Sequence, residues 1–269
     1  LLLQIQDLQG NPVASGQPAQ LQRVGYVTLV DLPALVVGTD YLVELTRPDT
    51  QADRDPGPLP GVAYTLGWAS ATPVDSGNIV ANGNAEDPNQ GVGHGEVVPL
   101  RFWTAPPGST LTVVGYGSPE FPGFNDMLPP DFGRAFFAGG PDVASSSAEQ
   151  RIDFTGQWAG WLPSIDAGRL TFRLSAFLGG FAGENDSASL EISFLDGNGQ
   201  PLGDVTTLGP VSDAERGGIT GFLPRTTDGL VPVGTRQVLL RLDMVRTDGV
   251  YDDGYADDIE LHLLDYPEQ

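Results

Sequence analysis

The chain has 269 residues and a formal net charge of −22, with 35 acidic and 13 basic side chains, no lysine and no cysteine. Such a charge repels phosphate backbones and anionic lipid headgroups, so nucleic acid and membrane surfaces are poor partners. The lack of cysteine excludes disulfides, thiolate catalysis and zinc–sulfur sites. The longest apolar run, at residues 32–38, is too short to insert across a bilayer.

Short alternating apolar runs separated by glycine and proline, 36 and 23 in number, predict an all-β protein, either a sandwich or a barrel. Residues 1–76 form a predicted N-terminal β segment or small β domain with about four strands, near residues 1–6, 24–30, 41–45 and 62–68. That number is small for an independent sandwich.

The first strand presents Leu1, Leu3 and Ile5 on one face. Such a strand either pairs within its own chain or acts as an arm that inserts into the open sheet edge of a neighbouring subunit. The sequence leaves both alternatives open.

Residues 77–269 follow a linker-like stretch and form the predicted main domain. Its strands are expected at residues 78–86, 97–103, 111–116, 151–154, 170–177, 190–195, 205–208, 237–245 and 259–264. Their period of two with one polar face indicates antiparallel sheets, and about eight strands are typical of a jelly-roll β-sandwich. Residues 196–200 resemble half of a helix–loop–helix calcium loop, but their place between two strands favours a hairpin turn.

An acidic stretch precedes the last strand. Asp252, Asp253, Asp257 and Asp258 crowd into what we predict to be a short glycine-containing turn. Neighbouring carboxylates repel one another unless a cation lies among them, and oxygen donors suit Ca²⁺. We expect this turn to reach back to residues 82–86 around a bound ion. The alternative is a solvated acidic turn.

From about residue 78 to 264 the chain resembles a jelly-roll module with a galactose-binding-like fold, found in secreted and surface proteins of bacteria. The residues that carry this resemblance are 82–86, 136–140, 165–168, 174–180, 194–196, 208–211, 231–236 and 253–257. The chain is also similar to calcium-dependent carbohydrate-binding jelly rolls. There, a glutamate after the first strand and an aspartate before the last bind one structural Ca²⁺. The resemblance implies Glu86 and Asp257 as metal ligands, with Asn84 and Asp253 as further ligands, and an extracellular or cell-surface location.

The sequence offers no recognisable active site. His94 lies in a glycine-rich loop and His262 on the polar face of a strand, with no zinc spacing and no serine in a nucleophile elbow. Acidic residues that might serve as a glycosidase pair are available in any chain of this charge. We therefore expect a protein that is not an enzyme.

Exposed aromatic rings stack on sugars, and Trp158 and Trp161, with Trp103 and Tyr116 near other strand ends, are candidates for such a platform. The alternative is that these rings pack in the core or at an interface. Two functional hypotheses follow. The first is a secreted structural or adhesive protein, in its sharpest form a filament subunit that self-associates through its N-terminal strand or contacts cell-surface partners. The alternative is a carbohydrate-binding module that presents its aromatic residues to a glycan.

Overall fold

The computed structural model describes residues 2–6, 12–16, 42–46 and 73–265 of the chain. The chain divides into two units, Leu1–Ser70 and Ala71–Gln269. Among the described residues, no helix has both the length and the apolar character needed to cross a membrane.

The first unit contains a three-stranded antiparallel sheet in the order β2-β1-β3, with bounds Leu2–Gln6 for β1, Pro12–Gly16 for β2 and Leu42–Thr46 for β3. Strand β1 is the central strand, since Leu3 and Ile5 have backbone partners in both neighbours. Both edges of β1 are thus occupied within its own chain. Leu3 and Ile5 thus pair within the chain, which is one of the two alternatives, while insertion into a neighbouring subunit stays a prediction. Leu1 lies outside the described residues, as do the strands predicted at 24–30 and 62–68.

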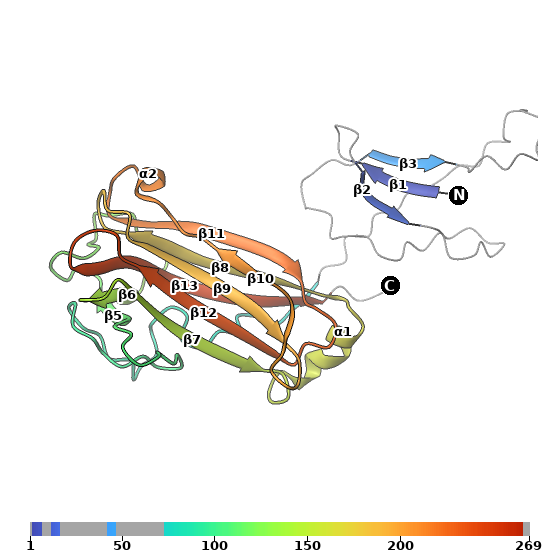
Figure 1. Ribbon diagram of the computed structural model, residues 1–269, viewed down its shortest axis with the longest axis horizontal. Coiled ribbons are helices and arrows are strands. Elements are labelled where there is room, and N and C mark those ends of the chain that lie inside the picture. The colour runs from blue at the N-terminus through green and yellow to red at the C-terminus, as the bar shows by residue number, and fades with distance from the viewer. Residues whose placement is uncertain (1, 7–11, 17–41, 47–72, 266–269) are drawn as a thin grey trace, which may run out of the picture. The chain divides into compact units, whose positions relative to one another are not determined.

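The second unit is an antiparallel β-sandwich of two sheets (Figure 1). One sheet has the order β10-β9-β12-β7, and the other has the order β11-β8-β13-β6-β5 with β4 also paired to β13. The strands are β4 (Val74–Asp75), β5 (Thr112–Gly115), β6 (Ala135–Pro141), β7 (Ser145–Asp153), β8 (Leu170–Gly180), β9 (Ser187–Leu195), β10 (Pro201–Leu208), β11 (Gly221–Leu230), β12 (Gln237–Val245) and β13 (Tyr251–Asp265). Three short helices, η1 (Ala159–Trp161), α1 (Leu162–Asp166) and α2 (Asp213–Arg216), lie in the connections. The predicted all-β jelly-roll sandwich is confirmed.

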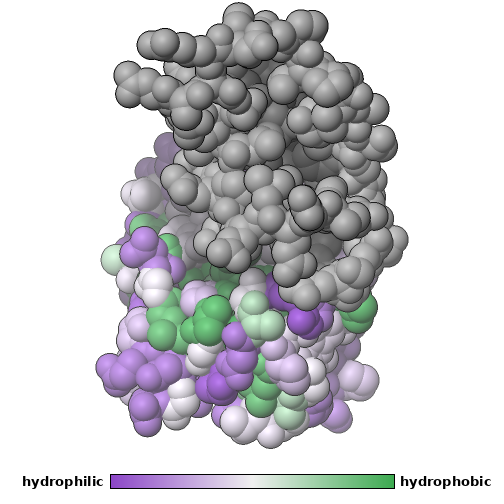
Figure 2. Space-filling view, turned by 90° about the vertical axis from the view of Figure 1, so that its right-hand side faces the viewer, coloured by the Kyte–Doolittle hydropathy of each residue, from purple (hydrophilic) through white to green (hydrophobic). Residues whose placement is uncertain are grey.

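The main core lies between the sheets and comes from the period-two alternation of the strands. Leu170, Phe172 and Leu174 of β8 are buried, while Arg173 between them is exposed. The same pattern holds in β9 and β12, whose predicted positions were close. Residues 196–200 form the predicted hairpin turn, in which the Asp196 carboxylate accepts backbone hydrogen bonds from Asn198 and Gln200 at 2.8 Å each. On the part of the surface coloured in Figure 2, hydrophobic residues lie among hydrophilic ones.

A second, aromatic cluster covers the outer face of the six-stranded sheet. In β6, Phe137 belongs to the main core, so its neighbours Phe136 and Ala138 point to the opposite face. Together with Val114, Phe222 and Tyr255 they form this second cluster. Residues of the connection between β5 and β6, including Tyr116 and Phe121, pack onto it. The sheet is therefore buried on both sides at this place.

Strand β13 corrects the prediction of an acidic turn. Residues 251–258 continue into the last strand without a break, pairing with β6 on one side and β8 on the other. A bulge between Asp257 and Glu260 places Asp258 at a φ of 47°, a left-handed conformation that aspartate tolerates. The aspartates thus belong to an interior strand of the sheet.

Residues 78–86, predicted as a strand, form turns that run beside β13. The Ile259 amide donates to the Gly83 carbonyl at 3.0 Å, and the Ile79 amide donates to the Leu261 carbonyl at 2.9 Å. Since β4 already pairs with β13, the sandwich begins before Val74, earlier than the predicted boundary at 76/77. Residues 97–103 are not a strand either, because Pro99 interrupts the run and cannot donate a ladder hydrogen bond.

The close approach of residue 83 to β13 generates a prediction. A Cβ atom on Gly83 would lie 2.0 Å from the Ile259 carbonyl oxygen, so one of the two backbones must move. We expect Gly83→Ala to lower the free energy of unfolding by about 2–3 kcal/mol, as overpacked interiors do. Gly156→Ala, where a Cβ meets nothing within 4 Å, is the control. Equal stability of the two variants in urea unfolding would contradict the close approach.

Candidate functional site

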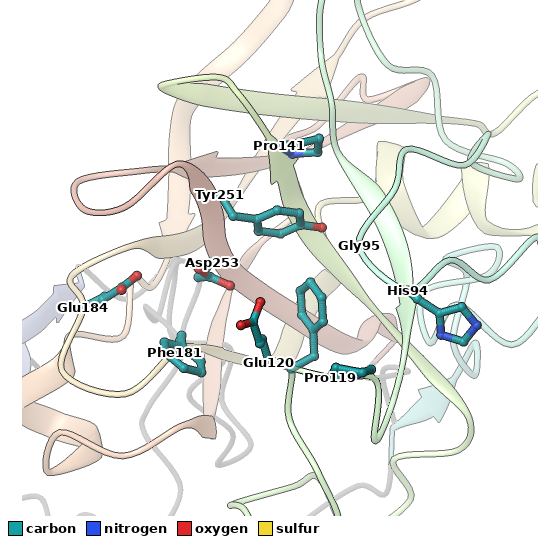
Figure 3. A pocket seen from close by; sticks show the side chains of 10 residues that line it. His94, Gly95, Pro119, Glu120, Pro141, Phe181, Glu184, Tyr251 and Asp253 are labelled. Atoms are coloured by element: carbon teal, nitrogen blue, oxygen red, sulfur yellow. The ribbon is translucent and has the colours of Figure 1, made fainter.

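A cleft of about 390 Å³ opens beside the N-terminal end of β13 (Figure 3). Five separate segments line it: two loops, the end of β6, the chain that follows β8, and the first residues of β13. The lining residues are His94, Gly95, Pro119, Glu120, Phe121, Pro141, Phe181, Glu184, Tyr251 and Asp253. We call this feature the acidic aromatic cleft.

The walls of the cleft are aromatic. The rings of Phe121 and Tyr251 meet edge to face, with centroids 5.2 Å apart and planes at 75°. Phe181, which directly follows β8, contributes a third ring. The hydroxyl of Tyr251 is buried and has no hydrogen-bond partner, although a buried phenol usually finds one. The cleft therefore combines flat apolar surfaces with an unsatisfied polar group.

The floor of the cleft is acidic. Glu184, Asp186 and Asp253 each place a carboxylate oxygen within 4.8 Å of the other two, the tightest such group in the described part of the chain. The carboxylate of Glu120 points toward the same space beneath Tyr251 (Figure 3). Burial, with the charges of Glu184, Asp186 and Glu120, raises the pKa of Asp253 to about 6.

The three clustered carboxylates differ in how well they are satisfied. Fully buried Asp186 accepts four hydrogen bonds, which are donated by the amides of Thr247 (2.5 Å), Asp248 (2.9 Å) and Asp253 (3.0 Å) and the hydroxyl of Thr247 (3.2 Å). Asp253 accepts one from the Tyr255 hydroxyl at 2.5 Å. In Glu184 the buried oxygen Oε2 has no partner. Asp186 is thus structural, whereas the Glu184 carboxylate lines the cleft, and its unpartnered Oε2 is inaccessible to solvent.

Arg216 holds the cleft wall that follows β8. Its buried guanidinium donates to the backbone carbonyls of Gly180 (2.8 Å), Ala182 (3.0 Å) and Glu184 (2.8 Å), and also to Ile219 (2.6 Å). The side chain comes from α2, which a capping box at Ser212 stabilises. Because these hydrogen bonds go to backbone carbonyls, Arg216 positions Phe181 and Glu184 without forming a direct ion pair with the Glu184 carboxylate.

Of the metal ligands implied by the resemblance, Asp257 lies farther along β13 and Glu86 lies in the turns that run beside this strand. Glu86 accepts hydrogen bonds from the amides of Arg134 (2.7 Å) and Ala135 (2.9 Å), and pairs with the Arg134 side chain at 3.1 Å. Asp257 is buried and accepts from the Tyr116 hydroxyl at 2.6 Å and the Asp258 amide at 2.8 Å. Burial, then the charges of Asp258 and Glu86, raise the pKa of Asp257 well above its usual value. Glu86 and Asp257 therefore lie within electrostatic reach of each other.

The two further predicted ligands, Asn84 and Asp253, lie at different sites. Asn84 stays beside Glu86, since its side-chain oxygen accepts from the Glu86 amide at 3.3 Å. Asp253 instead belongs to the group with Glu184 and Asp186 in the cleft. The donors around Asp257 are all oxygen and carry excess negative charge, which fits a hard cation such as Ca²⁺. The Arg134 side chain already offsets part of the charge on Glu86.

The predicted sugar platform is corrected in part. Trp103 is 5% exposed and sits in the main core, with its Nε1 donating to the Asn82 carbonyl at 3.3 Å, so it presents no face to a ligand. Tyr116 packs in the aromatic cluster and donates to Asp257. Trp158 and Trp161 are half-buried against the main core beside α1. None of the four lines the acidic aromatic cleft.

Comparisons with known proteins give likenesses of fold at low identity. No protein-family model and no curated protein matches the chain. A tailspike protein 4 domain of bacteriophage CBA120, described as enzymatically active, is 17% identical with a TM-score of 0.42, over 68% of this chain and 21% of that one. TmCBM61, solved with β-1,4-galactotriose, is 15% identical with a TM-score of 0.38, over 68% and 97%. The CBM22-1 xylan-binding domain of Paenibacillus barcinonensis Xyn10C is 13% identical with a TM-score of 0.35, over 65% and 92%.

The charge at the bulge of β13 predicts a pH-dependent stability. Burial, then the charges of Glu260, Asp131 and Glu86, raise the pKa of Asp258 from 3.8 to about 6. The folded state binds this proton more tightly than the unfolded chain, so its stabilising effect is complete below about pH 4 and is lost as the pH rises through about 6. In the presence of a chelator at about pH 8, the free energy of unfolding of Asp258→Asn should exceed that of the wild type by about 1 kcal/mol. This value allows for the partial exposure of Asp258, which weakens the electrostatic effect.

Urea unfolding at about pH 4 and about pH 8 measures this difference, which should vanish at the lower pH. Asparagine suits the left-handed conformation of position 258, so the backbone is not strained by the change. Asp204→Asn, on exposed β10, is the control and should show no such pH dependence. A stability gain of Asp258→Asn that is the same at both pH values would contradict the raised pKa.

Proposed function

We propose that the protein is a carbohydrate-binding module that holds its glycan in the acidic aromatic cleft. The observation that carries the proposal is that one cleft combines three aromatic rings with three carboxylates. Sugar rings offer both chemistries that such a cleft needs. Their C–H faces pack on aromatic rings, and their hydroxyls donate to carboxylates.

Three groups would bind the glycan. Phe181 and Tyr251 offer ring surface, and Glu184 offers a carboxylate. Because Arg216 and the strands β6 and β13 fix the walls, the site is largely formed before the ligand arrives, which lowers the entropic cost of binding.

The proposal includes an extracellular location, because the polymeric glycans that a carbohydrate-binding module would bind lie in cell walls and on cell surfaces. The prediction that the protein is not an enzyme stays a prediction. It is tested by incubating bound oligosaccharides with the protein and looking for shortened products. Products that disappear on mutation of Glu120 or Asp253 would show hydrolysis instead.

A structural Ca²⁺ held by Asp257 and Glu86, with Asn84 beside them, is the second part of the proposal. The ion would lie where β13 meets residues 78–86, and it would offset the repulsion among Asp257, Asp258 and Glu86. Its role would be to stabilise the sandwich, because binding to the folded state alone raises the apparent stability. The glycan cleft lies at the other end of the acidic part of β13.

The glycan proposal predicts which aromatic substitutions matter. Phe181→Ala and Tyr251→Ala should each reduce affinity for the best ligand on a glycan array at least tenfold, since each removes a ring from the cleft wall. Trp158→Ala and Trp161→Ala, outside the cleft, are the matched controls and should bind normally. If the tryptophan variants lose binding and the cleft variants keep it, the glycan lies elsewhere.

The metal proposal predicts a stability response. Ca²⁺ added to chelator-treated protein near neutral pH should raise the melting temperature by several degrees, consistent with about 1–3 kcal/mol of linkage. Asp257→Asn, which can keep the Tyr116 hydrogen bond, should abolish this increase. Asp253→Asn should leave it intact. A response that depends on Asp253 and not on Asp257 would move the ion to the cleft.

A further inference from the structure

The acidic aromatic cleft is not neutral, and its charge restricts the glycans that it can hold. Three of its ten lining residues, Glu120, Glu184 and Asp253, carry carboxylates, and none of the ten is an arginine or a lysine. Asp186 lies directly beside two of them. An anionic sugar would meet uncompensated like charge there, which costs binding free energy.

The nearest basic side chains do not neutralise this charge across the cleft. Arg216 directs its hydrogen bonds to backbone carbonyls behind the wall, including those of Gly180 and Glu184. Arg246 donates to the carbonyl of Val143 at 2.7 Å and also to that of Gly249. His94 lines the cleft and directs its Nδ1 to the Ser118 hydroxyl at 3.0 Å. The carboxylates therefore face the cleft with acceptor capacity that a cationic ligand can use.

A bare metal ion fits this arrangement poorly. Asp186 already accepts four hydrogen bonds and Asp253 accepts one from Tyr255, so the clustered group offers few free oxygens, whereas Ca²⁺ takes six to eight. The aromatic walls of Phe121, Phe181 and Tyr251 would give a metal ion nothing to coordinate. They attract an organic ammonium through the ring faces and pack against the carbon skeleton that carries it.

We infer that the cleft selects amino sugars, with a protonated ammonium group of the glycan placed among Glu184, Asp253 and Glu120 and the sugar ring packed against the aromatic walls. This inference rests on the proposed glycan-binding function and adds the class of ligand. An ammonium has three donors and a full positive charge, so it can donate to the carboxylates that line the cleft and offset the repulsion among them. An N-acetylated sugar loses both properties.

Calorimetry near neutral pH with three trisaccharides tests this: β-1,4-linked glucosamine, its fully N-acetylated counterpart and the neutral cellotriose. We expect glucosamine to bind at least tenfold more tightly than the other two, and Glu184→Gln to reduce this preference to about twofold or less. Glu120→Gln, at an exposed position, is a second variant in case the first fails to fold, and should also weaken the preference. Asp204→Asn removes one charge from β10 and is the control that should keep it.

The outcomes separate the two proposals. Equal binding of all three sugars, with Phe181→Ala abolishing it, would overturn the amino-sugar inference and leave the glycan cleft in place. Failure of every sugar to bind would overturn both. Binding that requires Ca²⁺ in the Asp257→Asn variant as well as in the wild type would also overturn the inference, because a metal ion would then occupy the carboxylates of the cleft. A preference unchanged in both glutamine variants would show that the selectivity comes from another surface.

Discussion

The burial of carboxylates on one central strand is the constraint on which the rest of this structure depends. Asp252 and Asp257 of β13 are almost inaccessible to solvent, and burial raises the pKa of Asp252 to about 7. Moving an ionised carboxylate out of water costs several kcal/mol unless hydrogen bonds or cations compensate. The fold supplies hydrogen bonds, from the Tyr116 hydroxyl to Asp257 and from the Tyr255 hydroxyl to Asp253. The remaining negative charge lies at two places that reach the surface: the acidic aromatic cleft, and the group of Glu86, Asp257 and Asp258.

Both places lie on the outer face of the same sheet and share one aromatic layer. Along β13, tyrosine and aspartate alternate on that face, with Tyr255 in the centre of the cluster around Phe136. The aromatic layer excludes water, so a cation beside these carboxylates interacts more strongly than it would at an open surface. The aromatic packing therefore raises the free-energy cost of leaving the carboxylates of β13 unpaired, and it also strengthens their attraction to a cation. The proposed glycan cleft and the proposed calcium site would both be consequences of one buried acidic strand.

The sequence predicted the sandwich because most strands alternate apolar and polar residues with one face in the main core, as β8, β9 and β12 do. The strand at residues 251–258 was not predicted, because neither face of that stretch shows the usual apolar pattern. Small or acidic residues point inward, and tyrosines and aspartates point to the aromatic layer. Four aspartates beside a glycine therefore led to the prediction of a turn. Their meeting with residues 78–86 was still predicted, since the resemblance placed the two chain ends together, and the Ile259–Gly83 hydrogen bond joins them.

The cleft could not be predicted in the same way, because its residues come from five segments whose juxtaposition depends on the sheet order. Trp158 and Trp161 were conspicuous as a pair in sequence, but exposure is a tertiary property, and their rings pack against the core. Phe181 and Glu184 have no pattern that marks them, and their place in the cleft depends on tertiary contacts such as those of the Arg216 guanidinium with the backbone around them. The unsatisfied Tyr251 hydroxyl and Glu184 oxygen destabilise the free protein. A ligand that brings donors and positive charge to the carboxylates lining the cleft would offset the repulsion among them, so the proposed site would favour an occupant rich in hydrogen-bond donors.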